Sequence, residues 1–397
     1  MRCLIIEPEC DGHYIVLYIK FIIRILSKKK IEIVLLTSNQ SKNHTSLKII
    51  KKENPKIEIE YFEYEKPKKY NTFYLIFHQI RLYFLIKKSF IKISKKYDFD
   101  RIFLNSIDHF DKALAIFGNP FNLTPFSGIF VNPKFHLKYS KLGNAGRFNL
   151  LASFLFKKLL EIKNLKEILT NDPFFIEYLK KKKYLNYKKL TFLAEPREFN
   201  FNFKNKIAKK LLNLPVNSIV TLVYGSLKFS KGILELLDVL LCDKISKKII
   251  VILAGHQNLE ITKILKDPIY QELINKKKLF IYKGFQDEKN EALLFSAANI
   301  IWVGYQKNFP FLSGVLYQAA IKNVPIIASS HGIIGNMNKK YKLGCSVNIN
   351  DQESIITAFN KMCDQVTYNR FKKNSKLVAK KASPKFFMKQ VIESLNK

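Results

Sequence analysis

The stretch "IVTLVYGSLKFSKGILELLDVL" (219–240) places a short apolar run, a glycine-containing turn and a helical repeat in direct succession. The run 219–224 has the length and the apolar content of a strand that is buried on both faces. Apolar residues then recur at helical spacing over 231–242, and a second apolar run follows at 249–253. A strand, a helix and a strand in this order form a β-α-β unit with parallel strands. The stretch therefore predicts a parallel sheet covered by helices.

The same alternation continues through the chain, and it is interrupted once by the polar segment "AEPREFNFNFKNK" (194–206). We therefore predict an α/β protein with two doubly wound, Rossmann-like domains that face a cleft, residues 1–198 and 199–366, followed by helices over 367–397. Ligands of such sheets bind at the carboxyl ends of the strands. The predicted strands are 3–6, 32–36, 57–61, 101–104, 128–131, 167–170, 190–193, 219–224, 249–253, 279–282, 300–303, 325–328 and 346–348, and the main helices are 14–28, 72–96, 147–162, 231–242, 288–297, 313–322 and 351–363.

The charge balance is strongly basic. The 397 residues include 68 Lys and Arg against 32 Asp and Glu, a formal net charge of +36. Such a charge suggests an anionic partner such as a nucleic acid, an acidic membrane face or a phosphorylated substrate. Lysine, isoleucine, asparagine and phenylalanine are all abundant while arginine is rare, a mixture that A- and T-rich coding also produces. Both origins of the charge remain open, and without a nucleic-acid-binding motif we expect no nucleic-acid partner.

The amino terminus and the cysteines indicate a cytoplasmic protein. Glu7, Glu9 and Asp11 follow the first apolar segment at once, which is not the pattern of a signal peptide. The cysteines are odd in number and scattered, as expected of reduced thiols. No apolar stretch reaches the length of about 20 residues that a membrane-spanning helix needs. The basic apolar segment 71–96 fits an amphipathic helix on an anionic membrane surface or a buried helix with a solvated lysine tail, and both interpretations remain open.

The turn after the strand 219–224 is a candidate anion site. Gly225 begins it, and free backbone N–H groups and a positive dipole end face the edge of the sheet where the next helix starts. Lys231 and Lys228 would add positive charge against a diphosphate. The alternative is a plain turn with solvated lysines. Downstream, Ser313 and Gly314 in "LSGV" open another helix and form a second candidate cradle, or alternatively an N-cap and a close packing contact.

Two further loops follow predicted strands of the first half. "CDGHY" (10–14) contains Gly12, which permits close backbone approach, and His13. "LNSIDHFDKA" (104–113) contains Asp108 and His109. Histidine and aspartate at strand ends can orient or deprotonate a hydroxyl group, so His13, Asp108 and His109 are the catalytic candidates. Ordinary capping and loop roles are the alternative for each of them.

The order "LVYGSLKFSKGI", "VILAGH", "IYKGFQDEKNEALLFSAANIIWVGY" and "LSGVLYQAAIKNVPIIAS" resembles the donor domain of GT-B glycosyltransferases of the retaining, family-four-like type. The resemblance covers most of 207–365, while the first half agrees in architecture and in the glycine and histidine of "EPECDGHY". It implies a nucleotide-sugar donor bound by the second domain. It also implies that helices from about 367 onward cross back to the first domain.

Some positions match the family's donor-binding residues. The resemblance implies that Lys231 contacts the sugar-nucleotide diphosphate. Ser226 stands where many members have an arginine with the same task, and Lys228 is the candidate substitute. Gly284 and Phe285 match the loop whose backbone commonly reads the nucleotide base.

Other positions match only in part. Ser313 and Gly314 match the helix start beneath the diphosphate. Gln318 and Pro310 stand in the places of the family's spaced pair of glutamates, so both carboxylates are absent. The amide of Gln318 can still hydrogen-bond ribose hydroxyls.

The resemblance implies transfer of a sugar from a nucleotide diphosphate sugar to a hydroxyl of a saccharide or lipid-linked saccharide, in cell-surface polysaccharide or glycan synthesis. The retaining type implies no dedicated nucleophile. We expect no cofactor besides this co-substrate, and we assign no metal ligands because no cluster has suitable spacing. A nucleotide-sugar epimerase of the same fold and a non-catalytic polyanion binder are the alternatives. An isomerised donor sugar in the absence of acceptor would identify the epimerase.

Overall fold

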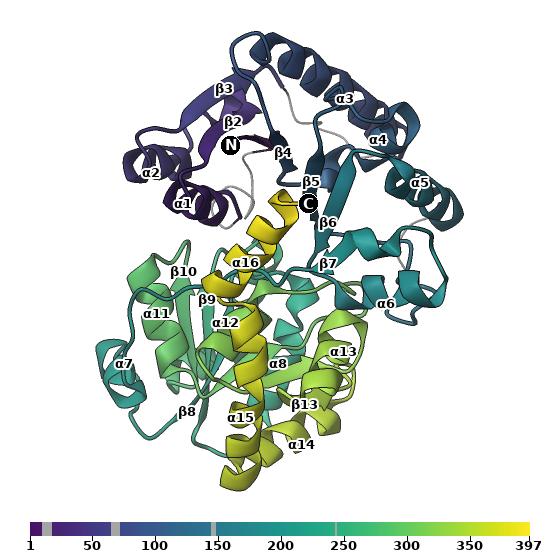
Figure 1. Cartoon of the computed structure of the whole chain (residues 1–397). Helices are drawn as coiled ribbons and strands as arrows, with labels where there is room; N and C mark the ends of the chain where they lie inside the picture. Colours follow the sequence, from purple (N-terminus) through teal and green to yellow (C-terminus); the bar gives the residue numbers. More distant parts are fainter. Residues whose placement is uncertain (10–17, 65–71, 144–147, 243) are drawn as a thin grey trace. The chain divides into compact units, whose positions relative to one another are not determined.

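The protein is described by a computed structural model that covers residues 1–9, 18–64, 72–143, 148–242 and 244–397. The chain divides into two compact units (Figure 1). The first contains most of the chain up to Pro196 together with Pro384–Lys397, and the second contains Arg197–Ser383. Each unit is a parallel sheet with helices on both faces, so the predicted α/β class with two Rossmann-like domains is confirmed.

The sheet of the first unit has the strand order β3-β2-β1-β4-β5-β6-β7, and all its pairs are parallel. The chain winds outward from β1 to β3 and then returns to the other side of β1 with β4. This reversal is the switch point of the sheet, where ligands of doubly wound folds bind. The strands are β1 (Arg2–Glu7), β2 (Glu32–Ser38), β3 (Glu58–Phe62), β4 (Arg101–Leu104), β5 (Phe126–Phe130), β6 (Leu165–Thr170) and β7 (Leu190–Phe192).

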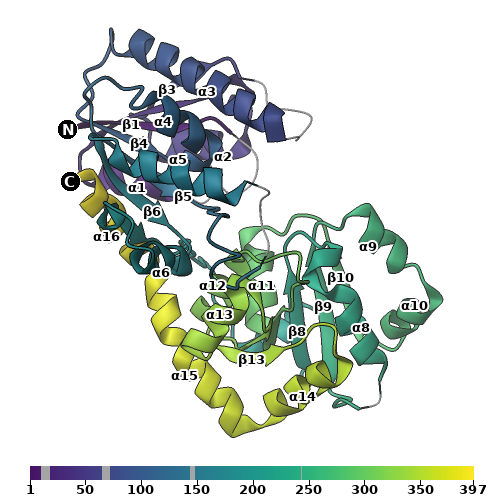
Figure 2. The same ribbon diagram turned by 90° about the vertical axis from the view of Figure 1, so that its right-hand side faces the viewer.

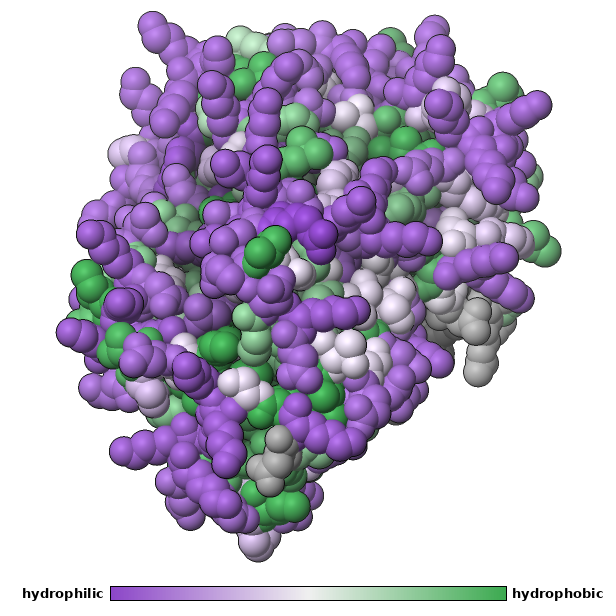
Figure 3. Space-filling model, turned by 90° about the horizontal axis from the view of Figure 1, so that it is seen from below, coloured by the Kyte–Doolittle hydropathy of each residue, from purple (hydrophilic) through white to green (hydrophobic). Residues whose placement is uncertain are grey.

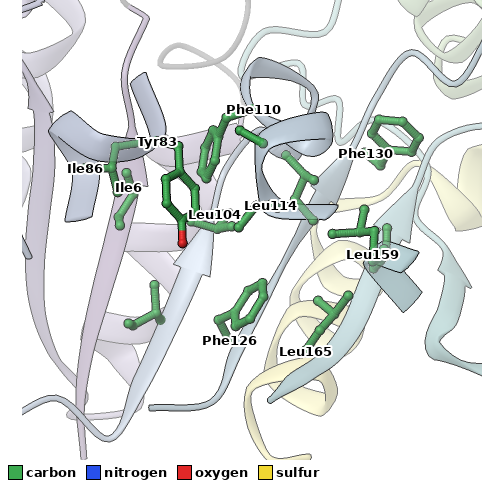
Figure 4. Close-up of a cluster of buried hydrophobic side chains, with 14 of the residues drawn as sticks. Ile6, Tyr83, Ile86, Leu104, Phe110, Leu114, Phe126, Phe130, Leu159 and Leu165 are labelled. Carbon is green, nitrogen blue, oxygen red and sulfur yellow. The ribbon is translucent and has the colours of Figure 1, made fainter. Parts of the chain in front are cut away.

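Helices cover both faces of this sheet (Figure 2). The apolar cluster drawn in Figure 4 packs one face against α3, α4, α5 and α6, and a second cluster packs the other face against α1, α2 and α16. The side chains of both clusters are buried between the sheet and the helices, away from water. The helices are α1 (Lys20–Lys28), α2 (Thr45–Glu53), α3 (Thr72–Ile93), α4 (Asp111–Phe117), α5 (Asn149–Glu161), α6 (Pro173–Lys181) and α16 (Pro384–Leu395), with short 3-10 turns η2 (Asn39–Ser41), η3 (Ile107–His109) and η4 (Tyr187–Lys189).

The sheet of the second unit has the order β10-β9-β8-β11-β12-β13, again parallel throughout, and its switch point lies between β8 and β11. Its strands are β8 (Ile219–Tyr224), β9 (Ile249–Gly255), β10 (Leu279–Lys283), β11 (Ile300–Val303), β12 (Ile326–Ser329) and β13 (Gly344–Val347). Its helices are α7 (Asn205–Leu211), α8 (Ile233–Leu241), α9 (Leu259–Ile264), α10 (Pro268–Asn275), α11 (Glu288–Ala297), α12 (Gly314–Ile321), α13 (Gly332–Tyr341), α14 (Gln352–Cys363) and α15 (Gln365–Lys381), with the 3-10 turn η5 (Phe229–Lys231) before α8.

The last two helices belong to different units. α15 packs against α12 and α14 of the second unit. α16 packs against α1 of the first unit, where the ring of Phe387 lies 6.0 Å from that of Tyr18 and 6.3 Å from that of Phe21. The chain therefore returns to the first unit at Pro384.

The lysines lie mainly on the surface, and the face in Figure 3 is covered largely by hydrophilic side chains with hydrophobic ones scattered among them. Within the described ranges, no helix combines the length and the apolar composition that crossing a bilayer requires. The predicted helix 14–28 is seen as α1 from Lys20, and residues 14–17 lie outside the described part of the chain.

Candidate functional site

Lys231 lies at the switch point of the second sheet. β8 and β11 are hydrogen-bonded neighbours there, so the turn after β8 and the loop after β11 leave the same edge of the sheet. The Nζ atom of Lys231 donates to the backbone oxygen of Tyr224 at 2.8 Å and to the hydroxyl oxygen of Tyr305 at 3.0 Å. The Tyr305 hydroxyl in turn donates to Oγ of Ser313 at 2.8 Å. Tyr305 therefore joins the two predicted cradles into one polar cluster.

Ser313 and Gly314 form the amino end of α12. Oγ of Ser313 accepts a hydrogen bond from the backbone N–H of Val315 at 3.4 Å and caps the helix. The first N–H groups of α12 and the ammonium of Lys231 are thus held near each other by the two hydroxyl groups. Together they supply the positive dipole end and the full charge that a phosphate group requires.

Three glycines bring the backbone of adjacent strand ends close together. Gly225 and Gly255 have φ values of +97° and +133°, which residues with a Cβ rarely adopt. A Cβ on Gly255 would lie 1.9 Å from the backbone oxygen of Gly225. The N–H of Gly284 donates to the oxygen of Gly255 at 3.0 Å. Gly225, Gly255 and Gly284 therefore lie side by side at the carboxyl ends of β8, β9 and β10, and we call this row the glycine edge.

Gln318 does not stand alone on α12. Its amide nitrogen donates to Oε1 of Glu291 on α11 at 2.6 Å, and Gln318 is only 3% exposed. Burial raises the pKa of the nearby Tyr224 hydroxyl, and the charge of Glu291 and a hydrogen bond to it raise this pKa further. A carboxylate therefore lies beside the position where the resemblance leads us to expect one, although it comes from a different helix.

Two other predicted donor residues face solvent. Lys228 is exposed, and its backbone oxygen accepts from the N–H of Lys231 at 3.0 Å. Phe285 is 94% exposed on the loop after β10. In the described structure, these side chains lie outside the cluster of Lys231, Tyr305 and Ser313.

A second cluster of polar residues lies at the switch point of the first sheet. Glu7 ends β1, and its Oε2 accepts from the side-chain amide of Asn105 at 2.7 Å, directly after the neighbouring strand β4. His109 of η3 lies between two carboxylates. Its Nε2 is 3.4 Å from Oε1 of Glu7, and its Nδ1 is 3.4 Å from Oε1 of Glu9. The Glu7 side chain is fully buried, whereas those of Glu9 and His109 keep 14% and 13% exposure.

These contacts set the protonation of His109. Burial lowers the pKa of its imidazole, but the hydrogen bond and charge of Glu7, with the charges of Glu9 and Asp108, outweigh burial and raise it. The cluster extends to Tyr64, whose hydroxyl lies 3.4 Å from Oε1 of Glu9 and 3.0 Å from Nε2 of His78. Burial is the main cause that lowers the pKa of His78. The site thus holds one histidine of raised pKa and one of lowered pKa.

Asp108 has a different environment from its neighbour. Its two carboxylate oxygens accept hydrogen bonds from the backbone N–H groups of Val131 and Asn132, both at 2.7 Å. Burial raises the pKa of Asp108, and the two backbone hydrogen bonds oppose this. The carboxylate therefore ties the loop after β4 to the chain that leaves β5.

Gly12 and His13 lie outside the described residues, and their predicted roles remain predictions. Several residues of the two clusters had not been predicted as site residues: Tyr305, Glu7, Glu9, Asn105, Tyr64 and His78. The two glutamates had a signal in the sequence, since acidic residues directly after the first strand lie at the ligand-binding edge of the sheet. Tyr305 also follows a strand directly, but its contact with Lys231 depends on the pairing of β8 and β11.

Comparison with solved structures assigns the architecture. Sucrose-phosphate synthase from Thermosynechococcus elongatus superposes with a TM-score of 0.71 and 15% identity over 99% of this chain and 98% of that chain. The chain has the GT-B fold. A glycosyltransferase from Rickettsia africae ESF-5 superposes with a TM-score of 0.65 and 16% identity over 99% and 97% of the two chains. Anabaena HepE in complex with UDP gives a TM-score of 0.67 and 15% identity over 100% of both chains.

The superpositions bear out the GT-B fold that the sequence stretches of the second half predict. No protein-family model matches the sequence, and no curated protein matches it. At 16% identity or less, these solved structures establish the fold of this GT-B chain and leave its chemistry to its own residues.

Proposed function

We propose that this GT-B protein is a glycosyltransferase that moves a sugar from a nucleotide diphosphate sugar to a hydroxyl of a saccharide or lipid-linked saccharide. The observation that carries the proposal is the cluster of Lys231, Tyr305 and Ser313 at the switch point of the second sheet. It combines a lysine ammonium, two hydroxyl groups and a helix amino terminus, which suits a diphosphate. Such groups stabilise the negative charge that develops on a leaving diphosphate.

We propose the glycine edge as the place where the nucleotide approaches the backbone. Gly225, Gly255 and Gly284 carry no side chains that would block it, and Gly284 and Phe285 remain the predicted base-reading loop. The pair of Gln318 and Glu291, which are hydrogen-bonded to each other, is the proposed contact for ribose hydroxyls. A hydroxyl group can donate to the carboxylate and can exchange hydrogen bonds with the amide. UDP is the first nucleotide to test, because HepE is described in complex with UDP and with UDP-glucose.

We propose that Nδ1 of His109, on the side of the more exposed Glu9, receives the proton of the acceptor hydroxyl when the acceptor takes the place of the Glu9 contact. Its raised pKa makes the neutral imidazole a stronger base than a free histidine. Glu7 would orient the ring and stabilise the imidazolium that forms, and the more exposed Glu9 would meet the acceptor. Asp108 is proposed as a positioning residue because both of its carboxylate oxygens accept hydrogen bonds from backbone N–H groups.

Retention of anomeric configuration, independence of a metal ion and a role in cell-surface polysaccharide or glycan synthesis are further parts of the proposal. We also propose that the protein acts in the cytoplasm at the inner face of a membrane, where a lipid-linked acceptor would be held. The stereochemistry can be tested by NMR of the product formed from a donor of known anomeric configuration.

A thermal-shift panel tests the donor class. UDP, GDP, ADP and their sugar conjugates are added to the purified protein, since a ligand that binds the folded state raises the unfolding temperature. We expect one nucleotide family to stabilise the protein at concentrations where the others do not. Stabilisation by none of them, or equally by any polyanion, would contradict the proposal.

Replacing Tyr305 by phenylalanine removes the hydroxyl that joins Lys231 and Ser313 while leaving the ring stacked on Phe309, 4.3 Å away. We expect the diphosphate to bind about fivefold more weakly, the effect of one hydrogen bond worth about 1 kcal/mol. Calorimetric titration with UDP measures this. Tyr270→Phe is the matched control, because its hydroxyl bonds Asp238 at 3.0 Å on another part of the unit, and it should leave binding unchanged.

Replacing Glu7 by glutamine removes the charge that raises the pKa of His109 but keeps an oxygen for Asn105. Since the folded pKa is raised, His109 is protonated below it and acts as a base only above it. The variant should therefore move the acidic limb of the kcat/KM profile to lower pH. Glu60→Gln changes a half-buried carboxylate of β3 that pairs with Lys96, and it should leave the profile in place. If the pH profile of Glu7→Gln coincides with that of the wild type, Glu7 does not set the pKa of the catalytic base.

A further inference from the structure

The outer side of α3 carries a regular stripe of apolar and basic side chains. Phe77, Arg81, Phe84, Lys88 and Ile91 follow one another at spacings of four, three, four and three residues, so they share one face of the helix. All five are exposed, and the exposed fractions of the apolar three are 66%, 48% and 48%. The opposite face of α3 is buried against the sheet. The exposed apolar side chains are therefore not needed for the core.

Exposed apolar side chains also lie on the neighbouring helices α4 and α5. α4 packs against both neighbours, as Figure 2 shows, and the ring of Phe84 lies 5.2 Å from that of Phe117 on α4. On α5, Leu150 is 77% exposed and Phe154 is 54% exposed, with the ammonium of Lys158 over the Phe154 ring. We call this surface the α3–α5 face, and its exposed apolar side chains are Leu75, Phe77, Phe84, Ile91, Ile116, Phe117, Leu150, Leu151 and Phe154. Large exposed apolar side chains gathered on neighbouring helices of a folded domain indicate an interaction site.

The charge of the α3–α5 face points to an anionic partner. α3 contains no acidic residue, and its basic residues are Arg81, Lys87, Lys88 and Lys92. The spacing of the stripe also matches a coiled-coil seam, but a second copy of α3 would place two Arg81 and two Lys88 side chains in one interface. Like charges in such a seam repel, so self-association through this stripe is disfavoured. The partner of the α3–α5 face must instead combine negative charge with an apolar layer into which side chains can insert.

We propose that the α3–α5 face docks the protein on an anionic lipid bilayer, with the phenylalanine, leucine and isoleucine side chains inserted at the interface and the basic side chains on lipid phosphates. Large apolar side chains can enter the interface between headgroups and acyl chains, and neighbouring basic side chains are attracted to anionic lipids. The inference deepens the proposed function, on which it rests for the lipid-linked acceptor. It extends the surface from α3 alone to three adjacent helices.

The test is co-flotation of the full chain with vesicles of phosphatidylcholine mixed with phosphatidylglycerol, compared with phosphatidylcholine alone. We expect binding to the anionic vesicles, and a loss of about tenfold or more in partition for Phe77→Ser/Ile91→Ser and for Arg81→Gln/Lys88→Gln. The control Leu259→Ser/Val366→Ser removes side chains that are 81% and 78% exposed on the second unit and should bind like the wild type.

The variant Phe77→Ser/Ile91→Ser distinguishes docking by the α3–α5 face from adsorption by charge alone, which a chain of charge +36 could also show on anionic vesicles. Equal binding of Phe77→Ser/Ile91→Ser and the wild type would overturn the proposal, as would a dimer in solution that this variant dissociates. The UDP thermal shift is measured on the same samples. Lost flotation with an intact UDP shift supports docking, and flotation by this face without any nucleotide shift would contradict the glycosyltransferase proposal alone.

Discussion

Replacing Lys231 by alanine is expected to lower kcat/KM at least tenfold, or about 1.4 kcal/mol of transition-state stabilisation, and to weaken nucleoside diphosphate binding. The Lys231 ammonium is held at the switch point by the oxygen of Tyr224 and the hydroxyl of Tyr305. The tyrosine hydroxyl can turn from Ser313 towards a phosphate, but it carries no charge, so the alanine variant loses the positive charge of the ammonium at this place. UDP titration and single-turnover transfer measure the two effects.

Lys248→Ala is the matched control for Lys231→Ala. Lys248 is an exposed lysine that directly precedes β9, at the opposite edge of the same sheet, so its removal changes the net charge equally. Its kinetics should equal those of the wild type. Lys228→Ala tests separately whether this exposed lysine substitutes for the arginine that Ser226 replaces. Unchanged kinetics in Lys231→Ala would remove the diphosphate role and leave the lysine as a structural contact.

Much of the fold was predictable because buried parallel strands are short, continuous apolar runs. β4 and β8 have the predicted bounds, and α11 begins after Asp287, whose side chain accepts from the N–H of Asn290. The packing of α16 on the first unit was expected only from resemblance. It depends on contacts such as Phe387 with Tyr18, which are far apart in the sequence and leave no periodic signal.

The candidate site was less predictable, since its side chains meet through strand order. Lys231 was recognisable from its place after a strand and before a helix. Its contact with Tyr305 required β8 to pair with β11, and the pair of Glu7 and His109 required β1 to pair with β4. Local sequence specifies that a strand forms but not which strand lies beside it. Gly255 shows the same limit, because a Cβ there would clash with the backbone of Gly225, which directly follows the neighbouring strand β8.

Replacing His109 by alanine is expected to lower turnover about 100-fold, the contribution of one positioned general base, while UDP binding stays unchanged. The expectation rests on an imidazole that lies between Glu7 and Glu9 with a raised pKa. The fall should appear in kcat, because His109 lies in the first unit and the proposed diphosphate contacts lie in the second. The variant should also lose the acidic limb of the pH profile, an effect that a structural role of His109 would not produce.

His44→Ala is the matched control for His109→Ala, because it makes the same change in the same unit. Its Nδ1 accepts from the N–H of Ser46 and caps α2. The variant should therefore lose about 1 kcal/mol of stability, while its turnover stays equal to that of the wild type. His109→Ala should keep a UDP-induced thermal shift equal to that of the wild type, which shows that the second unit remains folded. Full turnover in His109→Ala would mean that the acceptor proton leaves by another route, such as the departing diphosphate, and that the cluster around Glu7 serves the stability of the first sheet.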